Sequence, residues 1–135
     1  MNEGFEQLMA FIGSQLPEPV EESDGAAGEI VFSGRDPVEV VVHLTASTVV
    51  VFEFAREWTT DSLVARPRRV GLVKWGRLPE TDMMNALSAL IKGARESRRA
   101  KFRVCRSCGR NTPPELLYAA DMCVPCAGDE PGTVH

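Results

Sequence analysis

Four cysteines near one end of the chain are the residues whose type and spacing most clearly point to chemistry. They form two Cys-x-x-Cys pairs, Cys105 with Cys108 and Cys123 with Cys126, and fourteen residues separate the pairs. The two-residue gap lets both thiolates of a pair face one ion from a tight turn. Gly109 follows the first pair, where such turns favour a residue with positive φ. The pattern therefore predicts one structural Zn²⁺ held by four sulfurs, with no coordination position left for a catalytic water.

Two other kinds of thiol chemistry remain as alternatives to zinc. A redox Cys-x-x-Cys normally lies between a strand and a helix of a thioredoxin-like unit, and neither pair has that setting in the sequence. An iron–sulfur cluster would also accept four thiolates, but nothing else in the sequence indicates electron transfer. We therefore prefer zinc, with a redox pair and an iron site as the alternatives.

The cysteine segment, about residues 103–128, resembles zinc ribbons and treble-clef zinc fingers. In these fingers a Cys-x-x-Cys-Gly turn precedes a hairpin and a second pair closes the site; in treble clefs that second pair opens a helix. Residues 127–131 leave space for about one helical turn, which favours a ribbon or a shortened clef. The resemblance covers about a fifth of the chain and implies nucleic-acid binding, protein docking or stabilisation equally. We recognise no family in residues 1–100.

The hydrophobic pattern upstream predicts an α+β domain over residues 1–102, followed by the zinc finger and a tail over residues 129–135. Apolar residues at helical spacing over residues 5–16 predict a first helix. The next acidic, Gly-containing stretch, about residues 17–29, is interpreted as an exposed linker. Runs of β-branched and aromatic residues then predict an antiparallel meander of three or four strands. These runs are residues 30–33, 38–44, 48–54 and 70–75.

A long helix is predicted to begin near Pro79 and to lead into the cysteine segment. Its apolar residues recur at spacings of three and four and form a stripe suited to packing on the sheet. They are Met84, Leu87, Ile91 and Ala94. The helix ends in basic residues, which interact favourably with the negative end of the helix dipole.

Charge is distributed unevenly along the chain. Residues 1–55 carry ten acidic and one basic side chain, whereas residues 56–110 carry five acidic and fourteen basic ones. Intramolecular neutralisation is the preferred interpretation; the alternative is a basic ridge that binds a polyanion such as nucleic acid. That ridge would consist of Arg95, Arg98, Arg99, Lys101, Arg103, Arg106 and Arg110. A sequence pI near 5.2 argues against a dedicated nucleic-acid-binding protein.

The sequence contains no arrangement typical of a catalytic site. The two histidines are His43, in a predicted strand, and His135, the last residue. We therefore expect a non-enzymatic, cytoplasmic protein that acts through protein–protein interaction, with Trp58 as a candidate contact. Its partner is not identified by the sequence, no membrane segment is predicted, and homodimerisation is open to it through strand edges or helices. Between the cysteine pairs, residues 116–118 are expected to pack beneath the metal, with exposure of Tyr118 to a partner as the alternative.

Overall fold

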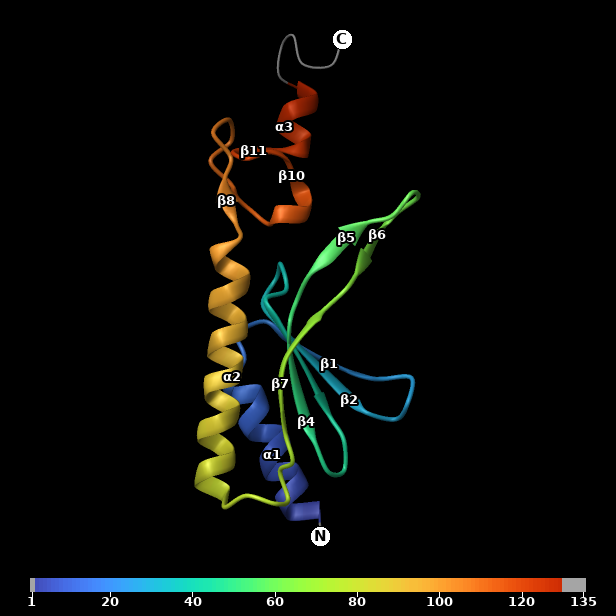
Figure 1. The fold of residues 1–135 in the computed structure, drawn as a ribbon, viewed down its shortest axis with the longest axis vertical. Helices are drawn as coiled ribbons and strands as arrows, with labels where there is room; N and C mark the ends of the chain where they lie inside the picture. The colour runs from blue at the N-terminus through green and yellow to red at the C-terminus, as the bar shows by residue number, and fades with distance from the viewer. Residues whose placement is uncertain (1, 130–135) are drawn as a thin grey trace.

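The computed structural model of the chain describes residues 2–129. Its elements, in chain order, are α1 (Asn2–Gln15), β1 (Val20–Asp24), β2 (Ile30–Gly34), β3 (Val40–Leu44), β4 (Val49–Glu53), β5 (Arg56–Trp58), β6 (Leu63–Ala65), β7 (Arg68–Val73), α2 (Glu80–Ala100), β8 (Arg103–Val104), β9 (Asn111–Thr112), the 3₁₀ turn η1 (Pro114–Leu116), β10 (Leu117–Ala119), β11 (Met122–Cys123) and α3 (Val124–Asp129). This order confirms the predicted α+β class with a C-terminal four-cysteine segment (Figure 1).

The main sheet is a five-stranded antiparallel meander in the order β1-β2-β3-β4-β7. The sequence predicted three or four strands. The difference arises at β1, because residues 20–24 of the acidic stretch interpreted as a linker form a strand that pairs with β2, from Val20 opposite Gly34 to Asp24 opposite Ile30. β1 is an edge strand whose side chains are mostly exposed. Because most of its side chains face solvent, β1 has a polar composition similar to that of a linker.

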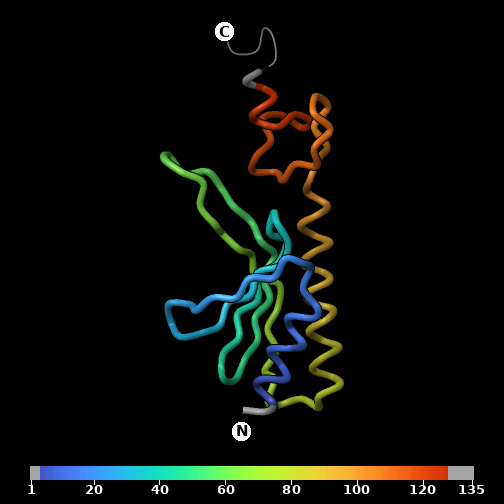
Figure 2. The backbone as a smooth tube through the Cα atoms, turned by 180° about the vertical axis from the view of Figure 1, so that it is seen from behind, coloured from blue at the N-terminus to red at the C-terminus, as the bar shows by residue number. Residues whose placement is uncertain are grey.

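Both long helices lie on the same side of this sheet, as the two opposite views show (Figures 1 and 2). Leu87, Ile91 and Ala94 of α2 are buried as predicted, and Met83 completes the buried stripe in place of Met84, which is partly buried. From α1, Leu8 and Ile12 are buried in the same core. The predicted amphipathic helices therefore supply the layer that covers one face of the sheet.

Two glycines identify which strand residues face the helices. A Cβ on Gly71 would lie 2.7 Å from Leu90 of α2, and one on Gly34 would lie 2.7 Å from Pro17. Because side chains alternate between the faces of a strand, the residues in register with these glycines face the helices. The intervening residues face away from α1 and α2. They are Glu21, Ser23, Val31, Ser33, Val41, His43, Val50, Phe52, Arg69 and Leu72, which we call the open face.

The connection between β4 and β7 is a second, smaller hairpin formed by β5 and β6. It projects from the sheet toward the end of the molecule that carries the four-cysteine segment (Figure 1). That segment is built from the small hairpins β8–β9 and β10–β11 and the helix α3. Among residues 2–129, no helix is both long and apolar enough to span a bilayer.

Candidate metal centre

The four cysteine sulfurs converge on one point, as the spacing predicts. Their Sγ atoms all lie within 4.8 Å of one another, and those of Cys108 and Cys123 are 3.9 Å apart. Tetrahedral coordination with Zn–S bonds of about 2.3 Å requires sulfurs about 3.8 Å apart. The observed distance between the Cys108 and Cys123 sulfurs is about twice the roughly 2 Å of a disulfide bond. The donor set and its spacing therefore fit one tetrahedral metal ion such as Zn²⁺.

Each cysteine pair is positioned by a different local structure. Cys105 and Cys108 lie in the turn between β8 and β9, where Gly109 has a φ of 74° and donates its backbone N–H to the Cys105 carbonyl at 2.8 Å. Cys123 ends β11, and Cys126 lies in α3. The second pair thus leads into a short helix, the feature that distinguishes treble clefs from ribbons in the resemblance described above.

Backbone N–H groups point at the first sulfur of the site. Those of Ser107 and Cys123 donate to Cys105 Sγ at 3.4 and 3.5 Å. Hydrogen bonds from the backbone of Cys123 and Cys108 lower the pKa of the Cys105 thiol to about 6. Hydrogen bonding to the Cys123 and Cys108 side chains raises the pKa of Cys126 to about 12. Without a cation, mutual repulsion makes it unfavourable for all four clustered thiols to ionise together. A divalent cation that binds them as thiolates offsets this repulsion.

Very little apolar surface supports the sulfurs. The buried cluster consists of Cys105, Met122, Cys123 and Ala127. The expectation that residues 116–118 pack beneath the metal is wrong for Tyr118, which is 65% exposed, and Leu116 and Leu117 are only partly buried and lie outside this cluster. Tyr118 is exposed, as the alternative expectation required; its contact with a partner stays a prediction. A core of this size contributes little hydrophobic stabilisation, so a metal ion bound by the four cysteines would add much of the segment's stability.

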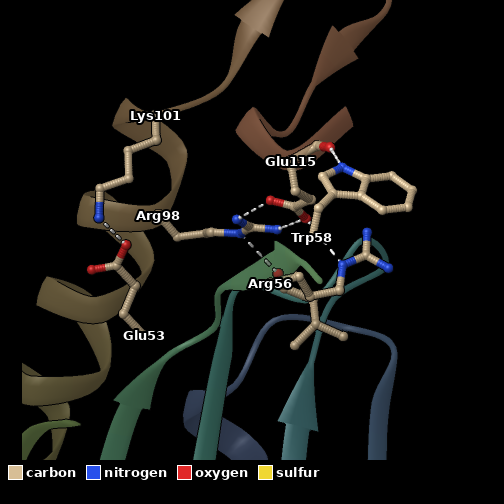
Figure 3. Close-up of polar contacts among 7 residues, drawn as sticks. Glu53, Arg56, Trp58, Arg98, Lys101 and Glu115 are labelled. Atoms are coloured by element: carbon tan, nitrogen blue, oxygen red, sulfur yellow. Dashed lines mark hydrogen bonds and ion pairs between the residues drawn. The ribbon is translucent and has the colours of Figure 1, made fainter. Parts of the chain in front are cut away.

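A buried acidic residue joins the four-cysteine segment to the α+β domain (Figure 3). Glu115 of η1 accepts two hydrogen bonds from the guanidinium of Arg98 at 2.9 and 2.7 Å. Arg56 of β5 donates a third at 3.1 Å. The indole N–H of Trp58 donates to the backbone carbonyl of Glu115 at 2.9 Å. One residue of the segment therefore holds both the end of α2 and the β5–β6 hairpin.

The Arg98–Glu115 pair is almost entirely shielded from water, with side chains 1% and 2% exposed. The guanidinium carbon of Arg98 lies 5.3 Å from the ring centroid of Phe54 and 5.0 Å from that of Phe102. Burial raises the pKa of Glu115, but the hydrogen bonds from Arg98, Arg56 and the backbone, together with the positive charge of Arg98, outweigh burial and leave the pKa below its usual value. The ionised carboxylate therefore stabilises the fold above its unfolded-state pKa, and this stabilisation is lost as the pH falls through the lowered folded-state value.

The basic residues predicted to form a ridge are only partly brought together, and several pair with acidic residues in the sheet or directly beside it. Arg95 and Arg99 pair with Glu39 at 3.1 and 3.0 Å, and Lys101 pairs with Glu53. This pairing agrees with intramolecular neutralisation, the preferred interpretation of the uneven charge along the sequence.

The remaining bases of the predicted ridge lie at the start of the four-cysteine segment. Arg103 donates to the carbonyls of Ala100 and Phe102. Arg106 lies 3.9 Å from exposed Asp121, and Arg110 is exposed. The ridge is therefore interrupted by internal ion pairs, and its proposed role in polyanion binding remains a prediction.

Two other candidate residues have identifiable surroundings. Trp58 is 61% exposed although its N–H is bonded to Glu115. His43 lies on the open face, with its ring 4.6 Å from that of Phe52 and Nδ1 3.9 Å from a carboxylate oxygen of Glu29. His135 and the tail from residue 130 lie outside the described residues. Sequence reasoning missed Glu115, and the only signal was an acidic residue within an otherwise apolar stretch.

Comparison with known proteins adds no assignment. No family model, no curated protein and no solved structure matches this chain.

Proposed function

We propose that this chain is a non-enzymatic protein-binding module in which one structural Zn²⁺ holds the C-terminal segment and the open face of the sheet binds protein. The observation that carries the proposal is the apolar composition of the open face. Val31, Val41, Val50, Phe52 and Leu72 occupy it side by side across four neighbouring strands.

The central strands have the pattern of strands covered on both faces. β3 reads Val-Val-Val-His-Leu and β4 reads Val-Val-Val-Phe-Glu. Antiparallel strands with one solvated face normally alternate apolar and polar residues, whereas near-continuous apolar runs are typical of strands buried on both sides. The helices cover one face only. On the open face Leu72 is 37% exposed and Val31, Val50 and Phe52 are partly exposed, whereas Val41 is buried. Contiguous apolar surface that reaches solvent commonly marks an interaction site. A protein partner would supply the missing cover.

The metal supports this function without taking part in chemistry. Four cysteines fill a tetrahedral coordination sphere, so a bound Zn²⁺ would act as a structural clamp. The clamp fixes Glu115, which in turn holds Arg98 and the β5–β6 hairpin. The internal pairing of Arg95, Arg99 and Lys101 favours this proposal over nucleic-acid binding, because paired bases are less available to phosphate.

A photo-cross-linking amino acid at position 50 tests the proposal in cells. We expect covalent capture of protein from Val50 on the open face, identified by mass spectrometry. The same group placed at exposed Tyr118, in the four-cysteine segment, is the matched control for random encounter. Capture at both positions alike, or at neither, would contradict a binding role for the open face.

A further inference from the structure

The open face carries opposite charges at its two edges. One row of residues in register crosses all five strands, and it reads Glu21, Ser33, Val41, Phe52 and Arg69. Glu21 lies on edge strand β1 and Arg69 on edge strand β7. Both are exposed, and neither has an ion pair among the described residues. The row therefore runs from an acidic end through an apolar centre to a basic end.

This arrangement is self-complementary under one particular two-fold rotation. β3 is the middle strand of the sheet. An axis parallel to β3 and just above it would stack a second open face on the first with the strand order reversed. Glu21 of each copy then faces Arg69 of the other, while Phe52 faces the β2 strand of the other copy. An in-plane axis perpendicular to the strands would instead place Glu21 on Glu21 and Arg69 on Arg69.

We propose that the occupant of the open face is a second copy of this chain, packed face to face about the axis parallel to the strands. This inference rests on the proposed function, and it identifies the bound protein as a second copy of the chain. The rotation covers the partly exposed Val50 and Phe52 of β4 in both copies and forms two Glu21–Arg69 pairs. Isologous two-fold interfaces of this kind are the commonest in soluble oligomers. A different protein would need the same apolar centre and the same order of charges to fit equally well.

The size of the sheet sets the expected strength of the dimer. Five strands of about five residues, spaced by about 4.8 Å with a rise of about 3.3 Å per residue, give a plan area of about 400 Å². Stable interfaces bury about 800 Å² per partner. The dimer is therefore expected to be weak and concentration-dependent, with a dissociation constant in the micromolar range or above.

Sedimentation equilibrium of the full, zinc-loaded chain tests the proposal. Wild-type protein should dimerise with rising concentration, and Phe52→Asp should weaken dimerisation at least about 100-fold because it places a charge in the apolar centre. Tyr118→Asp, a charge at an exposed site of the other segment, should have no effect. Circular dichroism establishes that each variant is folded.

Charge reversal tests the axis without disturbing the apolar centre. Glu21→Arg alone and Arg69→Glu alone should each weaken dimerisation about tenfold at low salt, because each faces like charges in both halves of the dimer. An equimolar mixture of the two variants should recover the wild-type affinity, since a mixed dimer pairs opposite charges at both positions. No recovery in the mixture would overturn the proposed axis.

The outcomes separate this inference from the proposed function. A wild-type chain that remains monomeric at millimolar concentration overturns the second copy as the occupant. If cross-linking from position 50 still captures a different protein, the module binds protein but not itself. If it captures nothing, the proposed function fails as well. Dimerisation that Phe52→Asp leaves unchanged would place the interface elsewhere and also overturn the inference.

Discussion

The α+β domain and the four-cysteine segment differ in what stabilises each of them. The domain buries a continuous apolar core between its helices and one face of its sheet, with residues such as Ile12 and Leu87 wholly removed from water. The segment has strands of two or three residues and a buried cluster containing two of its own cysteines. Burial alone can stabilise the first region, whereas we propose that a bound ion supplies most of the stability of the second. Glu115 is the point where the two regions depend on each other.

Removal of the metal should produce the largest difference between the regions. Zinc binding to comparable peptides supplies about 10–16 kcal/mol, so chelation or Cys105→Ser should unfold residues 103–129 while the domain keeps its structure. Hydrogen exchange by mass spectrometry would resolve the two regions. Ser107→Ala, in the same turn but without a ligand atom, is the control. Unfolding of the domain together with the segment would show that the domain is not stable on its own.

Glu115→Gln should have the next largest effect, because it leaves the Arg98 charge buried without a full counter-charge. Breaking a buried ion pair costs about 3–5 kcal/mol. We expect faster hydrogen exchange at the end of α2, in η1 and in the β5–β6 hairpin. Asp121→Asn, in an exposed pair of the same segment, should change stability by less than about 1 kcal/mol. Equal effects of the two substitutions would show that Glu115 does not join the regions.

Leu87→Ala tests the domain alone. Removing a fully buried leucine from a packed core costs about 2–5 kcal/mol, and the cost should appear in the free energy of unfolding measured with urea. Zinc content should not change, because Leu87 lies in the core cluster of the domain and not in that of the segment. Loss of zinc in this variant would mean that the segment depends on the domain core.

Trp58→Phe should have the smallest effect. It removes one hydrogen bond, from the indole N–H to the Glu115 carbonyl, worth about 1 kcal/mol. Exchange should rise only within residues 56–65. Trp75→Phe is the matched control, because its indole N–H donates to the Thr45 carbonyl at 3.1 Å within the domain. It should leave the hairpin unchanged.

The sequence predicted those features that depend on local pattern. The spacing of Leu87, Ile91 and Ala94 predicted α2 and its buried side, and the spacing of the two cysteine pairs predicted that their four sulfurs would cluster. β1 could not be predicted in the same way. An edge strand with polar side chains is specified by its pairing with β2 and not by its own composition.

Features that depend on distant residues were the hardest to predict. Arg98 appeared as one of several bases that complement a helix dipole, yet it is buried against a carboxylate 17 positions further along the chain. Glu39, directly before β3, and Glu53, the last residue of β4, pair with bases at the end of α2. The asymmetry of charge along the chain predicted that such pairing could occur. It did not indicate which bases would be paired and which would remain exposed.

X-ray absorption spectroscopy at the zinc edge of the purified chain tests whether the four cysteines form a closed structural zinc site. We expect about one equivalent of zinc with four sulfur neighbours at about 2.3 Å and no nitrogen or oxygen ligand. A coordination shell with fewer than four sulfurs and a light-atom ligand would contradict it. Such a shell would leave room for a metal-bound water and for metal-assisted chemistry.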